Sequence, residues 1–360
     1  MGGVAVGAKG VDSPVVATGW RMPAEWERHE ATWMAWPVRR SDWPGKFVPA
    51  LWSFVELVRL VAGAEPVRLV VPGREVELVA RTTLEKAGVA LSQVRFFHCP
   101  TDRNWLRDSG PMFVLGQDGR LAVAGWDFDG WGRFRTQHDR HVARKIAEAL
   151  GCEWLHCGAV LEGGAIDVNG QGLLLATEEC LLGRIGRRWR IDRGRWEQLF
   201  RAYLGVEDVI WLPWGLGDDE TGGHVDQVAR FIGPKRVAAA YAEDPRHPDC
   251  ARLQANWRVL ESWCVRRGLE LVRLPMPAPV YFARERLPAS YLNFYIANGL
   301  VVVPVFNDPE DRVALDTLAR AFPDRQVVGL YSRDLVLGEG GPHCLTQQQP
   351  AGPGSGVVVI

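Results

Sequence analysis

The sequence predicts a single α/β domain, and three observations lead to that prediction. Apolar runs typical of strands alternate along the chain with amphipathic stretches typical of helices. Apolar residues make up 47% of the chain and charged residues 24%, which is enough apolar material for a sizeable core. No Ser/Gly-rich linker or charge run divides the 360 residues. We therefore expect residues 19–360 to form one domain, preceded by a mobile tail at residues 1–18.

The expected strands are short runs rich in β-branched and other apolar residues. In chain order they are 67–71, 94–98, 173–177, 209–213, 237–241, 269–274, 300–304 and 326–330. The expected helices have apolar residues at helical spacing, near 48–62, 75–88, 138–150, 194–204, 249–267 and 309–322. The last helix has the clearest start signal, because Asn307-Asp308 offers a cap and Pro309 suits the first turn.

Charge and hydropathy exclude several classes of protein. The net charge of −1 provides no global field that would attract nucleic acid or an anionic membrane. No stretch approaches the roughly 18 apolar residues of a membrane helix. The N-terminal residues lack the basic region and long apolar core of a signal peptide. We expect a cytoplasmic protein that acts on a small molecule, without a nucleic-acid or membrane partner.

The seven cysteines indicate free thiols rather than a disulfide framework, because their number is odd and their spacing is irregular. They stand at positions 99, 152, 157, 180, 250, 264 and 344. Most free cysteines pack as small hydrophobic residues, and Cys180 and Cys264 fit that expectation. The GCEWLHCG segment has no second pair of ligands nearby, so we expect no metal site there.

Turn-rich segments with unusual polar residues recur along the chain. Their markers are Asp108, Glu162, His224, Asn293 and Cys344, separated by 54, 62, 69 and 51 residues. Recurrence at tens of residues is typical of modules packed around an axis or along a solenoid. Modules around an axis would each bring one polar segment to a common centre.

The chemistry of these segments points to a nucleophilic thiol. Cys344 follows Gly340-Gly341-Pro342, where glycine lets the backbone approach a ligand closely. His224, flanked by acids and glycines, is the best candidate acid or base for that thiol. Nearby carboxylates would raise the pKa of a thiol, which makes sense only if the substrate is itself a cation. A planar guanidinium suits bidentate carboxylates best.

Seven segments together carry a resemblance to a known family. They are MPAEWERHEATWMAWP, TDRNWLRDSGP, LEGGAIDVNGQG, TEECLL, DDETGGHVD, PASYLNFYIANG and GGPHCLTQQQP. In this order, over about residues 20–350, the chain resembles the family of agmatine deiminases and bacterial-type peptidylarginine deiminases. The resemblance implies a five-bladed α/β propeller of ββαβ modules with pseudo-fivefold symmetry and an active site on the axis.

The resemblance also implies roles for the marker residues. Cys344 would be the nucleophile and His224 the general acid and base. Asp108 and Asp226 would bind the guanidinium, and Glu162 would orient His224 and contact the guanidinium. Asn293 matches a position near the nucleophile, although its apolar neighbours are equally consistent with a core strand. No metal or organic cofactor is implied, and a homodimer is left open.

The substrate is less clearly indicated than the reaction. The acids Asp218, Asp219 and Glu220 and the aromatic residues Trp36 and Trp105 suit the cationic tail of agmatine, and Gly341 would line the substrate site. Two departures from the agmatine deiminase pattern, Arg103 in TDRNW and the NGQG turn at 169–172, weaken this assignment. Free arginine, peptidylarginine and transfer of the amidino group to an amine remain alternatives.

Overall fold

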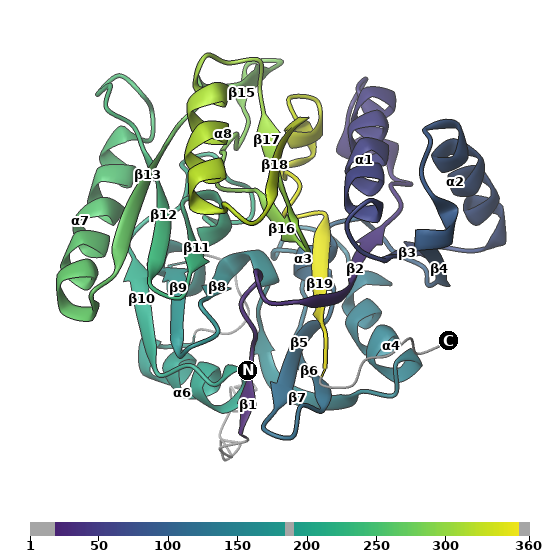
Figure 1. The fold of residues 1–360 in the computed structure, drawn as a ribbon, viewed down its shortest axis with the longest axis horizontal. Helices are drawn as coiled ribbons and strands as arrows, with labels where there is room; N and C mark the ends of the chain where they lie inside the picture. The colour runs from purple at the N-terminus through teal and green to yellow at the C-terminus, as the bar shows by residue number, and fades with distance from the viewer. Residues whose placement is uncertain (1–18, 184–190, 353–360) are drawn as a thin grey trace, which may run out of the picture.

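The computed structural model describes residues 19–183 and 191–352, and the tail expected at residues 1–18 lies outside the described residues. The chain is a mixed α/β protein with helices at the periphery and several short strands nearer the centre (Figure 1). No helix in the described part of the chain combines the length and the apolar character needed to cross a membrane.

Three sheets share one pattern of connection: two antiparallel strands, then a helix, then a third strand parallel to the second. The first unit contains β8 (Ile166–Val168), β9 (Leu173–Thr177), α6 (Arg193–Leu204) and β10 (Asp208–Leu212). The second contains β11 (Ala229–Gly233), β12 (Arg236–Tyr241), α7 (Cys250–Arg267) and β13 (Glu270–Pro275). The third contains β16 (Tyr295–Ala297), β17 (Leu300–Val305), α8 (Glu310–Ala321) and β18 (Gln326–Tyr331).

Two larger sheets extend the same pattern with one more strand each. One contains β5 (Met112–Gly116), β6 (Leu121–Asp127), α4 (Val142–Ala149) and β7 (Glu153–Val160), with β1 (Trp20–Arg21) at its edge. The other joins the two ends of the chain, because β19 (Thr346–Pro350) pairs with β2 (His29–Ala35). That sheet continues through α1 (Phe47–Ala62), β3 (Val67–Val71), α2 (Arg74–Lys86) and β4 (Val94–His98). A small hairpin, β14 (Tyr281–Phe282) and β15 (Glu285–Arg286), stands apart.

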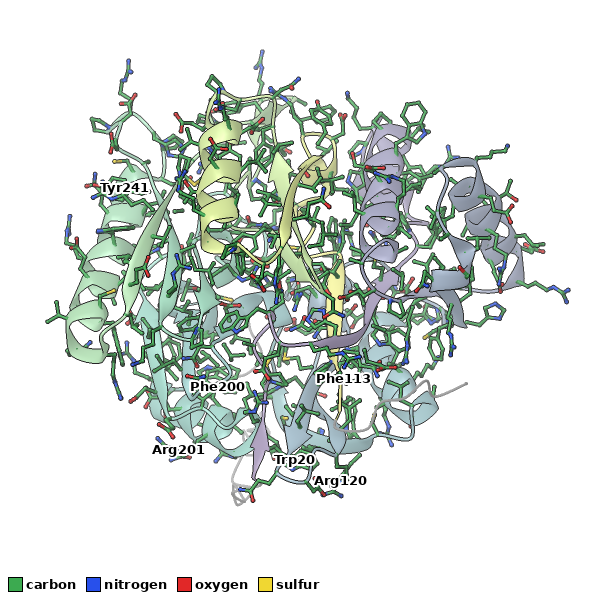
Figure 2. The ribbon with its side chains drawn as sticks, in the orientation of Figure 1. Trp20, Phe113, Arg120, Phe200, Arg201 and Tyr241 are labelled. Atoms are coloured by element: carbon green, nitrogen blue, oxygen red, sulfur yellow. The ribbon has the colours of Figure 1, made fainter. Side chains whose placement is uncertain are left out.

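Apolar side chains fill the space between helices and sheets, while most charged side chains outside the site point outward. Figure 2 shows this arrangement in side chains, with Phe113 and Phe200 buried and Arg120 and Arg201 exposed at the surface. Strands β3, β11 and β17 are buried along almost their whole length.

The predicted strands and helices are confirmed with small shifts at their ends. The run expected at 209–213 begins one residue earlier, and the helix expected at 138–150 begins with a 3₁₀ turn, Asp139–His141. The other described strands were not predicted, namely β1, β2, β5, β6, β7, β8, β11, β14, β15, β16 and β19. In β19 the reason is plain: its residues Thr346–Pro350 are polar yet buried, and Gln349 accepts hydrogen bonds from the side chains of Trp33 and Arg68.

The recurring polar segments have a common place in this architecture. Asp108, Glu162, Asp226, Asn293 and Cys344 each lie two to four residues before the first strand of a sheet, namely β5, β8, β11, β16 and β19. Their regular spacing in the sequence therefore reflects one segment for each sheet. Because these strands begin near one another, side chains from distant parts of the chain meet in one site.

Candidate active site

Cys344 is the centre of the site. It is buried, lies between the 3₁₀ turn Leu335–Gly338 and β19, and accepts a hydrogen bond at Sγ from Asn293 Nδ2 at 3.2 Å. Asn293 Oδ1 in turn accepts the backbone N–H of Gly341 at 3.0 Å. Asn293 itself lies in a loop before β16, so it is not part of a core strand. The Asn293 side chain therefore holds both the Cys344 thiol and the loop that carries Cys344.

The thiol of Cys344 is protonated in the free protein at neutral pH. Burial raises its pKa well above the usual value, and the negative charges of Asp226 and Asp108 raise it further. The hydrogen bond from Asn293 opposes this rise. A cation bound between the carboxylates would lower the pKa of the thiol, so thiolate formation is coupled to ligand charge.

His224 is buried beside two carboxylates. Its Nδ1 lies 3.9 Å from Asp108 Oδ1 and its Nε2 lies 3.8 Å from Glu162 Oε2, and neither ring nitrogen makes a hydrogen bond within the described structure. Burial alone would lower the pKa of His224, but Asp108, Cys180 and Glu162 raise it well above its usual value. His224 is therefore an imidazolium with a proton to donate.

The carboxylates Asp108 and Asp226 face the same space. Asp108 accepts hydrogen bonds from Trp131 Nε1 and from the backbone N–H of Gly164, both at 3.0 Å. Asp226 Oδ2 lies 3.6 Å from Cys344 Sγ, while its buried Oδ1 has no partner in the described structure. Burial would raise the pKa of Asp226, but His343 and His224 lower it below the usual value. An ionised carboxylate with a free oxygen is a binding site for a cationic donor.

Gly164, the second glycine of the LEGGA segment, lets these groups come together. A Cβ at this position would lie 2.6 Å from His224 Nδ1 and 3.0 Å from carboxyl oxygens of both Asp108 and Asp226. Such distances are far below van der Waals contact. Only glycine allows the backbone N–H to donate to Asp108 at so close an approach.

A buried ionic network behind the site was not predicted from the sequence. His343 Nδ1 contacts Asp226 Oδ2 at 2.7 Å, and His343 Nε2 contacts Glu25 Oε2 at 2.9 Å. Glu25 also pairs with Arg107 at 3.0 Å and with Arg230 at 2.9 Å. All of these side chains are buried. The network fixes the orientation of Asp226, and burial of charged residue types is not visible in a sequence.

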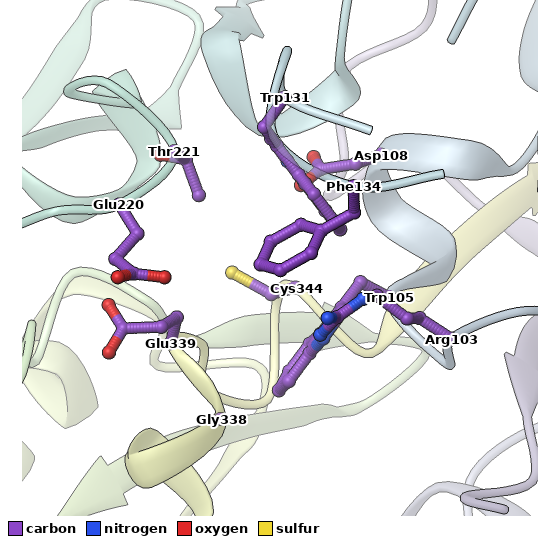
Figure 3. Close-up of a pocket in the computed structure, with 10 residues that line it drawn as sticks. All are labelled: Arg103, Trp105, Asp108, Trp131, Phe134, Glu220, Thr221, Gly338, Glu339 and Cys344. Atoms are coloured by element: carbon purple, nitrogen blue, oxygen red, sulfur yellow. The ribbon is translucent and has the colours of Figure 1, made fainter. Parts of the chain in front are cut away.

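A cavity opens above Cys344 (Figure 3), and the empty space within it and its open mouth together is about 410 Å³. Three aromatic side chains line it: Trp105, Trp131 and Phe134. Its other lining side chains include Asp108, Arg103, Thr221, Glu220 and Glu339. Figure 3 shows the Cys344 sulfur pointing into the cavity, with Asp108 on one side and the carboxyl groups of Glu220 and Glu339 on the other.

Several residues expected to bind substrate have other positions. Trp36 does not line the cavity; it is buried and its ring packs edge-on against Phe54. Asp219 holds the loop instead, because it accepts hydrogen bonds from the backbone N–H groups of Thr221 and His224 at 2.8 and 2.9 Å. Trp105 lines the cavity as expected, and Gly341 contributes its backbone to Asn293.

Cys180 is buried in the core, as its sequence context suggested, but it also borders the site. Its thiol lies within 4.8 Å of ligand atoms of both Glu162 and His224. Cysteine, histidine and glutamate are the residue types that bind zinc, so in the described residues this is the group best suited to a metal. The segment TEECLL, which contains Cys180, is one of the seven segments that carry the family resemblance. This was the signal in the sequence that could have placed Cys180 beside the site.

Because the pKa of Cys344 depends on the charges beside it, the rate at which Cys344 is alkylated should depend on pH and on the charge of the reagent. Inactivation by neutral iodoacetamide should accelerate roughly tenfold per pH unit over about pH 7 to 9, because the thiolate fraction rises below the raised pKa of Cys344. The cationic reagent 2-chloroacetamidine should react faster at neutral pH, since its charge offsets the carboxylates. Rates of inactivation measured with both reagents test this. A rate with iodoacetamide that does not change over this range would contradict the raised pKa.

Comparison with known proteins relates this arrangement to others. The family model described as Porphyromonas-type peptidyl-arginine deiminase matches residues 21–350. The agmatine deiminase of Ectopseudomonas mendocina is 39% identical over 366 residues, which cover 94% of this chain and 98% of that protein. The solved agmatine deiminase of Enterococcus faecalis is 33% identical with a TM-score of 0.85, covering 92% of this chain and 96% of the other. The C. jejuni agmatine deiminase with substrate bound is 28% identical, with a TM-score of 0.83 and coverage of 92% and 97%.

Proposed function

The chain belongs to the Porphyromonas-type peptidyl-arginine deiminase family, and on that premise we propose that it hydrolyses agmatine to N-carbamoylputrescine and ammonia. Such a hydrolase acts on a carbon–nitrogen bond of a linear amidine. The observation that carries the proposal is the ionised, partly unpaired Asp226, 3.6 Å from Cys344 Sγ, while Cys344 and Asp108 line the same cavity. The names of the relatives support agmatine over the other guanidines considered from the sequence.

In the proposed complex, the guanidinium lies between carboxylates and above the thiol. Asp226 Oδ1 has no partner in the described structure and can accept an N–H of the guanidinium. Asp108 and Glu162 supply negative charge on the side of His224. The aromatic rings of Trp105 and Trp131 line the cavity and suit the flat face of the cation.

The first half of the reaction forms a covalent intermediate. The bound cation lowers the pKa of Cys344, so that the thiol loses its proton to solvent, and the resulting thiolate attacks the central guanidinium carbon. His224 donates its proton to one terminal nitrogen, which leaves as ammonia when its bond to carbon breaks. The product is an S-alkylthiouronium on Cys344, and His224 is left neutral.

The second half returns the enzyme to its starting state. Neutral His224 takes a proton from a water molecule that enters the space left by ammonia, and the oxygen attacks the same carbon. The carbon–sulfur bond then breaks, and the ureido product is released after it loses the proton of the new hydroxyl group. The Cys344 thiolate takes up a proton again once the cation has left, which restores the starting thiol. One residue thus serves as acid in the first step and as base in the second.

The charged residues that line the cavity also favour one guanidine substrate over another. Arg103, which could have repelled a second positive charge, is engaged by Asp42 at 2.7 Å and lies over the ring of Phe134 at 3.7 Å. The far side of the cavity carries the carboxyl groups of Glu220 and Glu339. An amine at the end of the substrate fits this end better than a carboxylate.

The proposal is tested by supplying agmatine, free arginine and an arginine-containing peptide to the purified protein in parallel. We expect release of one ammonia for each agmatine consumed, without an added amine acceptor, and little release from the other two. Ammonia from arginine or the peptide alone would overturn the substrate assignment. Dependence of turnover on an amine acceptor would indicate amidino transfer instead.

We further propose that the five sheets of common connection are the blades of a five-bladed propeller and that residues 19–360 form one domain. The support is the shared order of strands and helix in each unit and the position of one site segment before the first strand of every sheet. In such a propeller the substrate would lie near the axis.

A further inference from the structure

Glu339 occupies an unusual backbone position at the edge of the cavity. It follows the 3₁₀ turn Leu335–Gly338, five residues before Cys344, and has a φ of 75°. This left-handed conformation is costly for residues other than glycine, asparagine and aspartate. A glutamate held there directs its side chain into the cavity, where it is one of the lining residues (Figure 3). Strained residues of this kind concentrate at ligand-binding sites.

The carboxyl group of Glu339 has no ion-pair partner among residues 19–183 and 191–352. It accepts a hydrogen bond from the backbone of Glu220, while its Oε2 is buried and has no partner in the described structure. Burial raises the pKa of Glu339 to about 8, the negative charges of Glu220 and Asp219 add to the rise, and Arg133 opposes it. The described protein groups therefore satisfy this carboxyl group only in part.

The other charged residues at this end of the cavity already have partners. Glu220 pairs with Arg133 at 2.8 Å, and the Arg133 guanidinium also donates to the Glu220 carbonyl at 3.4 Å. Arg103 pairs with Asp42. Among the residues that line this end of the cavity, Glu339 is thus the carboxylate left to bind an incoming cation.

We propose that Glu339 determines specificity by binding the terminal ammonium of the substrate, at the opposite side of the cavity from Asp108. This inference rests on the proposed function and deepens it. The same carboxylate would repel the α-carboxylate of free arginine, so the pocket would favour agmatine over a guanidine with a similar alkyl chain. Glu220, neutralised by Arg133, would contribute less.

The test compares agmatine with butylguanidine, which has the guanidinium but no terminal ammonium. In Glu339→Gln we expect KM for agmatine to rise about ten- to a hundredfold, because one hydrogen bond to a charged group is lost. KM for butylguanidine and kcat for both substrates should change little. In the wild type, KM for agmatine should fall as the pH passes upward through about 8 and Glu339 ionises; the variant should lack this change.

Arg133→Gln provides the matched control, because it releases Glu220 from its ion pair without removing a carboxylate. We expect Arg133→Gln alone to keep or strengthen the preference for agmatine. In the double variant, with both Arg133→Gln and Glu339→Gln, part of the loss caused by Glu339→Gln should be recovered. A Glu339→Gln variant with the wild-type ratio of kcat/KM for the two substrates would overturn the inference while the proposed function stands. A wild-type protein that does not hydrolyse agmatine would overturn both.

Discussion

Replacing Cys344 with alanine is expected to abolish hydrolysis of the guanidine substrate, by a factor on the order of 10⁴ or more in kcat. No other described group can form the covalent intermediate in the same place, because Cys344 Sγ is the sulfur that lines the cavity. Ammonia release at saturating agmatine measures the effect. Near-normal turnover in this variant would contradict the assignment of the nucleophile.

The loss in Cys344→Ala must come from chemistry and not from unfolding. The substitution removes one buried sulfur atom, and the backbone N–H of Gly341 keeps its acceptor on Asn293. We expect an unchanged circular dichroism spectrum and retained binding of agmatine by calorimetry. Cys264→Ala is the matched control: this thiol is half-buried on α7, away from the cavity lining, and its removal should leave kcat unchanged.

Replacing Glu25 with glutamine is expected to lower the free energy of unfolding by about 3–5 kcal/mol. Glu25 is the carboxylate shared by Arg107, Arg230 and His343, and all four side chains are buried. The variant removes the negative charge beside Arg107 in a place that water does not reach, and it leaves Arg230 with Asp167 as its remaining ion-pair partner among the described residues. The midpoint of urea unfolding measures the loss, and an unchanged midpoint would show that the network does not stabilise the fold.

Glu56→Gln controls for the removal of a carboxylate as such. Glu56 forms an exposed ion pair with Arg59 on α1, and breaking it should cost less than about 1 kcal/mol. The contribution of Glu25 should also depend on pH. Burial would raise its pKa, but Arg230, His343 and Arg107 hold it well below 4.5. Its stabilisation is therefore complete above about pH 4.5 and is lost on acidification toward the pKa of the folded state.

Much of the outer architecture could be predicted because it follows simple periodicity. The third strands of the sheets, such as β13 and β18, and helices such as α7 and α8 carry continuous apolar runs or helical spacing. The first strands could not be predicted in this way. Strand β19 buries three glutamines against Trp33, Arg68 and Arg107, so its burial depends on partners more than 200 residues away.

The residues of the site also divide into those that the sequence could predict and those that it could not. Cys344, His224, Asp108, Glu162 and Asp226 stand in glycine-rich turns with reactive residue types, and the structure brings them into one place. The side chains that hold these residues in place are harder to recognise from the amino-acid sequence. Glu25 and His343 are buried charges, whose role appears only when their partners are known. Trp36 was expected at the substrate site but packs in the core against Phe54. One tryptophan among 16 cannot be assigned to core or cavity by its residue type.

The central claim is a covalent intermediate on Cys344, and mass spectrometry of the protein quenched in acid during turnover tests it most directly. The proposed mechanism requires an adduct equal in mass to agmatine minus ammonia, located on the peptide that contains Cys344 and absent from Cys344→Ala. Ammonia release without any adduct on this cysteine, or with the adduct on Cys180, would contradict it.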